Sequence, residues 1–70
     1  MESKKDRFQR LATIRTNVVL QRLKVLGNCS NRQAYEYTEQ EIKKIFSAIE
    51  EQVKDVKAKF TPAKKDQFQL

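Results

Sequence analysis

The sequence contains no histidine or tryptophan, and only one cysteine, one glycine and one proline among its 70 residues. Cys29 alone cannot form a disulfide within the chain, and without histidine there is neither a Cys/His metal site nor an imidazole general base. No apolar run approaches the ~18 residues of a membrane span, and no signal-peptide core follows residues 1–6. We therefore expect a cytoplasmic protein with no metal, no cofactor and no membrane association.

The other groups that could carry out chemistry are also poorly arranged for catalysis. Cys29 has no basic partner of the kind that activates a nucleophile, so we expect a buried or half-buried inert thiol. The acidic pairs Glu39/Glu41 and Glu50/Glu51 are not spaced by four residues, so their carboxylates face different directions on a helix. The sequence therefore gives no support for an enzyme.

The first half of the chain predicts a helix over about residues 4–26. Its apolar residues cover about half of the circumference at ~100° per residue, which is wider than a contact with one other helix needs. We therefore expect this helix to touch neighbours on two sides, with Arg15 and Arg22 in the middle of the apolar face. Gly27 is predicted to end it in the left-handed conformation. The apolar residues are Phe8, Leu11, Ala12, Ile14, Val18, Val19, Leu23, Val25 and Leu26.

The second half predicts a helix over about residues 39–60. Thr38 and Glu41 are spaced as a capping box, and Tyr37 and Ile42 occupy the positions of a hydrophobic staple. Apolar residues then recur at alternating steps of four and three, the pattern of a helix that packs along another helix as in a coiled coil. Together with Leu11 and Val18, they are the predicted packing and oligomer interface. They are Ile42, Phe46, Ile49, Val53, Val56 and Phe60.

These elements predict an all-α fold, an antiparallel hairpin of two long helices. A loop over residues 27–37, with a short helical turn near Asn31–Tyr35, would join them, and residues 61–70 would form a flexible tail. A single core in a chain below roughly 70–80 residues rarely contributes more than about 3–5 kcal/mol. We therefore expect the hairpin to pair with a second copy into a homodimeric four-helix bundle.

Net charge is the second informative feature. The formal charge is +6, and the whole excess lies in residues 1–32, where eight basic residues face only Glu2 and Asp6. Such asymmetry indicates nucleic acid or an acidic partner, although a solvated surface explains it equally well. For Arg15 and Arg22, pairing with Glu41, Glu50 or Glu51 competes with binding of an external anion. The candidate anion or nucleic-acid contacts are Arg7, Arg10, Arg15, Arg22, Lys24 and Arg32.

The loop is a further candidate for partner binding. Asn31, Tyr35 and Tyr37 crowd a short segment, and tyrosine is a favoured anchor at protein interfaces. Local roles explain the same residues, because asparagine satisfies backbone groups and Tyr37 can staple the second helix. The local explanation is the stronger one.

Several segments resemble short uncharacterised bacterial helical proteins. The segments are RF-x-x-LA-x-x-R-x-N from Arg7, LGN-x-SNR-x-x-YEYT in the centre, and KIF-x-AIE with a closing K-x-KF that ends at Phe60. The resemblance implies no activity, cofactor or binding residue.

Two functions follow from these patterns. The first is a small non-catalytic interaction module, a regulator or adaptor that acts through helix-helix contacts with itself or with another protein. The alternative is a nucleic-acid-binding protein that uses the basic first helix. Salt dependence separates the two, because only phosphate contacts release counterions on binding.

Overall fold

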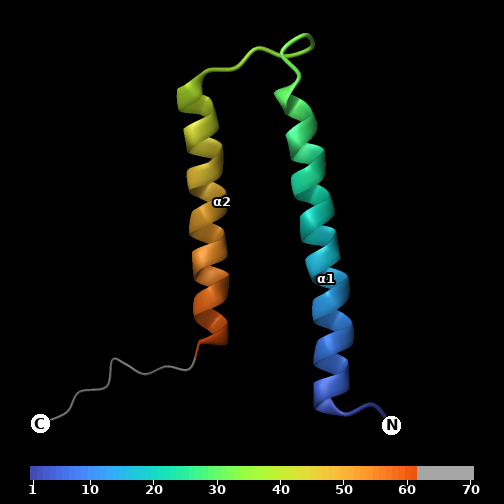
Figure 1. Ribbon diagram of the computed structural model, residues 1–70. Helices are drawn as coiled ribbons and strands as arrows, with labels where there is room; N and C mark the ends of the chain where they lie inside the picture. The colour runs from blue at the N-terminus through green and yellow to red at the C-terminus, as the bar shows by residue number, and fades with distance from the viewer. Residues whose placement is uncertain (62–70) are drawn as a thin grey trace, which may run out of the picture. The chain divides into compact units, whose positions relative to one another are not determined.

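The computed structural model describes residues 1–61, and these residues are all-α as predicted. Helix α1 spans Lys4–Gly27, a short 3-10 helix, η1, spans Asn28–Ser30, and helix α2 spans Glu39–Phe60 (Figure 1). The chain divides into two parts, Met1–Glu36 and Tyr37–Leu70, which are described separately below. The expected tail falls almost entirely outside the described residues.

Helix α1 begins at a cap that the sequence analysis missed. The Ser3 hydroxyl accepts a hydrogen bond of 3.0 Å from the Asp6 backbone N–H, which satisfies one of the free donors of the first turn. Asp6 also places a negative charge near the positive end of the helix dipole. The spacing Ser-x-x-Asp was visible in the sequence and is a shorter version of the capping box.

The predicted left-handed end at Gly27 is wrong. Gly27 has φ −59° and ψ −24°, and Asn28 continues in the same right-handed region, so the chain passes from α1 directly into η1. The Asn28 backbone N–H donates to the carbonyls of Val25 and Leu26 and so satisfies the helix end. Because this tightened turn pairs the last carbonyls, no residue with positive φ is required.

The chain leaves the helical conformation at Asn31, which has ψ 104°. Its carbonyl accepts from the backbone N–H groups of Ala34 and Tyr35, at 3.1 and 2.9 Å, and its side-chain oxygen accepts from Gln33 N–H at 3.0 Å. The predicted turn near Asn31–Tyr35 is therefore present, and Asn31 supplies a side-chain acceptor for it.

Helix α2 begins at the predicted capping box. The Thr38 hydroxyl accepts from Glu41 N–H at 3.1 Å, and the Glu41 carboxylate accepts from Thr38 N–H at 2.8 Å. At the other end, the Thr61 backbone N–H donates to the Ala58 carbonyl at 3.3 Å. Lys57 and Lys59 lie in the last turn, where the helix dipole favours positive charge.

None of residues 1–61 is buried. The few that are half-buried are Leu11, Ala12, Leu26, Tyr37, Ile42 and Ile49. Cys29 is exposed, so the expectation of a buried or half-buried thiol is wrong. Cys29 is the middle residue of η1, all three residues of which are exposed.

Candidate helix-packing surfaces

One side of α2 carries a continuous apolar surface, here called the α2 seam. At ~100° per residue its members, with Ile45 at one edge, fall within an arc of about 100°. Val53 is 52% exposed and Phe60 is 70% exposed, so most of this surface faces outward within its own part of the chain. The sequence predicted all of its members, and only Ile45, which lies at the edge of the seam, was missed. The α2 seam consists of Ile42, Phe46, Ile49, Val53, Val56 and Phe60.

Helix α1 carries two apolar stripes. Stripe A is formed by Phe8, Ala12, Val19, Leu23 and Leu26, and stripe B by Leu11, Ile14, Val18 and Val25. Both are largely exposed: Val19 of stripe A is 55% exposed and Val18 of stripe B is 52% exposed. The broad apolar arc expected from the sequence therefore consists of two narrower surfaces, each of a width suited to one neighbouring helix.

A line of positive charge separates the two stripes. Arg15 and Arg22 are seven residues apart, so they lie within about 20° of each other around the helix and about 10 Å apart along it. Within residues 1–36 neither arginine forms an ion pair, and the only carboxylates there are Glu2, Asp6 and Glu36. This arginine line is therefore left uncompensated by its own part of the chain.

Arg7 and Arg10, two other residues that were predicted to contact an anion, interact with the carboxylate of Glu2. The Arg10 guanidinium donates to both carboxylate oxygens of Glu2, from Nε at 2.8 Å and from Nη2 at 3.0 Å. Arg7 Nε lies 4.0 Å from the same carboxylate. This clasp over the start of α1 was missed in the sequence, because residues eight positions apart are not neighbours on a regular helix. It reduces the positive charge that Arg7 and Arg10 present to a partner.

The clasp predicts a measurable titration. The hydrogen bonds from Arg10 hold the pKa of the Glu2 carboxyl below its ordinary value, and they raise the pKa of Arg10. The clasp is therefore fully formed above the ordinary glutamate pKa and is lost as the pH falls through the lowered value. In ¹³C NMR, Glu2 should titrate at lower pH than in the Arg10→Gln variant. Identical Glu2 titration curves in the two proteins would show that the clasp does not form in solution.

The remaining basic candidates do not share one face. Relative to the arginine line, Lys24 lies about 160–180° around α1, and Arg32 follows the helix in the Asn31 turn. The basic residues of α1 are therefore distributed around the helix instead of forming a single strip.

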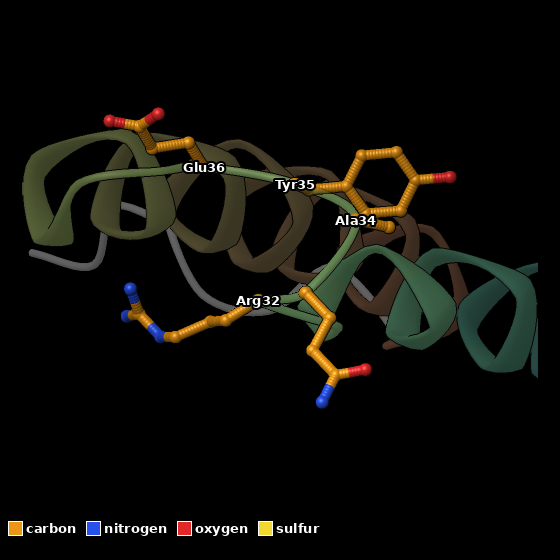
Figure 2. A pocket seen from close by; sticks show the side chains of 5 residues that line it. Arg32, Ala34, Tyr35 and Glu36 are labelled. Carbon is orange, nitrogen blue, oxygen red and sulfur yellow. The ribbon is translucent and has the colours of Figure 1, made fainter.

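The loop residues border a shallow, open hollow of about 340 Å³ formed by residues 32–36. Figure 2 shows the side chains of Arg32, Tyr35 and Glu36 pointing in three different directions, so they do not converge on a common point. Asn31 is used by the turn, and Tyr37 belongs to the second part of the chain. The hollow has the form of an irregular surface and lacks the enclosed shape of a ligand site.

Other kinds of site are absent from the described residues. No group of three or more acidic or cysteine side chains in residues 1–61 is placed to hold a metal ion. In the same residues, neither helix is long and apolar enough to cross a membrane.

Comparison with protein-family models, with curated proteins and with solved structures gave no match to this chain. The functional argument therefore depends on the surfaces described above.

Proposed function

We propose that this chain is a small, non-catalytic interaction module that acts through helix-helix contacts and associates with itself. The observation that supports it is the combination of continuous apolar surfaces on both helices with the lack of any buried residue among positions 1–61. Exposed apolar surfaces of this extent are typical of interaction sites. Covering them supplies the free energy that a chain of this length otherwise lacks.

Within one copy, we propose an antiparallel hairpin in which stripe A packs against the α2 seam. Two matches support this pairing. The same number of positions separates Phe8 from Leu26 as separates Ile42 from Phe60. An antiparallel alignment brings Leu26 beside Ile42 near the loop, Val19 beside Ile49 in the middle, and the two phenylalanines together at the far end.

Stripe B is not used in this hairpin and remains available to a second copy. Two hairpins that cover each other's stripe B form a four-helix bundle, which encloses both apolar surfaces of α1. We therefore propose that the protein is a homodimer. Its regulatory or adaptor role would follow from the surfaces that this dimer exposes to other proteins.

The direct test is sedimentation velocity of the purified chain over a wide range of concentrations. We expect a dimer that dissociates on dilution, with helical circular dichroism that weakens as monomer forms. A monomer at every concentration would contradict self-association, and helical content that did not change on dilution would argue against coupling of folding to assembly.

Nucleic-acid binding through α1 is the second candidate, and the observation in its favour is the charge excess confined to residues 1–32. It predicts that labelled duplex DNA or single-stranded RNA binds with an affinity that falls about 10³-fold between about 50 and 200 mM salt, given six or more phosphate contacts. The double variant Arg7→Glu with Arg10→Glu should abolish that binding without loss of helicity. Absence of binding at the lower salt concentration, measured by fluorescence anisotropy, would exclude this function.

A further inference from the structure

We infer that the arginine line of α1 forms two symmetric binding sites for a phosphate dianion in the homodimer, each built from Arg15 of one copy and Arg22 of the other. The inference depends on the proposed self-association through stripe B and names the ligand that completes that contact. It uses only residues of the first part of the chain, Met1–Glu36.

Stripe B is suited to packing against stripe B of a second copy, because its ends are equally far from its middle. Leu11 and Val25 are each seven residues from Val18. An antiparallel alignment of two copies therefore places Leu11 of each copy beside Val25 of the other, and the two Val18 side chains meet on the twofold axis. The two stripes then overlap over their full length, and the twofold symmetry closes the assembly at two copies.

Charge favours antiparallel over parallel pairing of the two α1 helices. Residues 1–10 contain four basic side chains and only two carboxylates. A parallel pair would bring these two basic ends together, along with the positive ends of both helix dipoles. An antiparallel pair separates them by the length of the helix, about 36 Å for the 24 residues of α1.

Antiparallel pairing brings the two arginine lines together. The line lies about 60° to one side of the centre of stripe B, and flanks of the same sense lie on the same side of an antiparallel contact. Along the helix axis, Arg15 lies about 4.5 Å on one side of Val18 and Arg22 about 6 Å on the other. After the twofold rotation, Arg15 of each copy is level with Arg22 of the other to within about 2 Å. The four guanidiniums therefore form two pairs, and each pair draws on both copies.

Each pair of guanidiniums needs an anion between them. Arginine stays charged at any ordinary pH, and like charges that face each other weaken a contact. The carboxylates of residues 1–36 are not placed to help: Glu2 accepts both hydrogen bonds from Arg10, Asp6 lies in the first turn of α1, and Glu36 lies beyond the end of the helix. An external ligand is therefore required at each pair.

A phosphate dianion matches such a pair in charge and in shape. A phosphate group carries a charge of about −1.5 to −2 at pH 7 and has at least three acceptor oxygens, so one group balances two arginines. A guanidinium binds two oxygens of one anion side by side. Two guanidiniums therefore need two edges of the anion, which a tetrahedral phosphate offers, whereas a planar carboxylate has only one such edge.

The test is sedimentation velocity of the full chain in phosphate and in chloride at the same pH and ionic strength. In about 50 mM sodium phosphate, the dimer dissociation constant should be at least about tenfold lower than in sodium chloride, because the ligand binds the dimer and not the monomer. Calorimetric titration with phosphate should give one site per chain, since each dimer holds two.

The double variant Arg15→Gln with Arg22→Gln separates a ligand site from a structural role. It should lose the response to phosphate and should dimerise in chloride at least as tightly as wild type, because like charges no longer meet. A structural role for the arginines predicts weaker dimerisation in both salts and would overturn the inference. The control Lys24→Gln with Lys44→Gln removes the same charge away from both stripes and the α2 seam, and should respond to phosphate like wild type.

The remaining outcomes are distinct from one another. Equal dimerisation of the wild-type chain in phosphate and in chloride would overturn the inference and leave the proposed self-association intact. A wild-type monomer in both salts would contradict the self-association itself. In a further arm, a single-stranded oligonucleotide replaces inorganic phosphate at the same phosphate concentration. A response to the oligonucleotide alone would also overturn the inference and would favour nucleic-acid binding through α1.

Discussion

Replacement of Ile49 by aspartate is expected to abolish assembly of this protein. Ile49 is one of the few half-buried residues and lies in the middle of the α2 seam. A carboxylate there would lose the apolar contact and leave an unpaired charge between helices, at a cost of about 4 kcal/mol, or roughly 10³-fold in the dimer dissociation constant. Sedimentation velocity and circular dichroism should show a monomer with reduced helicity.

The matched control for this variant is Ala48→Asp. Ala48 precedes Ile49 in the same helix but points away from the seam, so the change costs only the difference in helix propensity, about 0.7 kcal/mol or less. Assembly of Ala48→Asp like wild type, together with loss of assembly in Ile49→Asp, would localise the effect to the seam. Normal sedimentation of Ile49→Asp would exclude the seam as an interface.

The second large effect is expected at three consecutive residues of α1. Val18, Val19 and Leu20 are 52%, 55% and 55% exposed, so exposure alone does not distinguish them. They belong to different faces: Val18 lies in stripe B, Val19 in stripe A, and Leu20 on the opposite, polar side of the helix. Replacing each in turn by aspartate therefore compares three surfaces with nearly the same chemical change.

We expect three different results. Val18→Asp should weaken the dimer at least about 100-fold and give the same partly helical monomer that wild type gives on dilution. Val19→Asp should unfold the proposed hairpin, because a loss of about 3–5 kcal/mol equals the stability that a core of this size supplies. Leu20→Asp should change stability by about 0.5 kcal/mol or less. Sedimentation combined with thermal denaturation distinguishes these outcomes, and equal effects at all three positions would contradict the division of α1 into two stripes.

The features predicted correctly from the sequence are those fixed by neighbouring residues. The Thr38–Glu41 capping box is formed by groups three positions apart, and the long helices follow from apolar periodicity and the scarcity of glycine and proline. The α2 seam was recognised for the same reason, because a regular repeat on a regular helix places its members on one face.

The features that were missed depend on side-chain or backbone choices that a pattern does not determine. The Glu2 clasp needs an extended N-terminal segment that folds back to Arg10, and no periodic rule describes it. Gly27 was expected to adopt a left-handed conformation because glycine can do so without steric cost. Glycine adopts the right-handed conformation equally well, and the helix ends in η1 instead.

The capping arrangement has a consequence for how such a chain can evolve. Each helix carries its start signal in its own first turn, Ser3 with Asp6 for α1 and Thr38 with Glu41 for α2. Neither start depends on a hydrogen bond from the connecting segment. Insertions between Asn31 and Glu36 would therefore cost mainly loop-closure entropy, about 0.6 kcal/mol for each doubling of loop length. The connection can therefore lengthen in evolution, or two copies can exchange their second helices by domain swapping, without any change in the sequence of either helix.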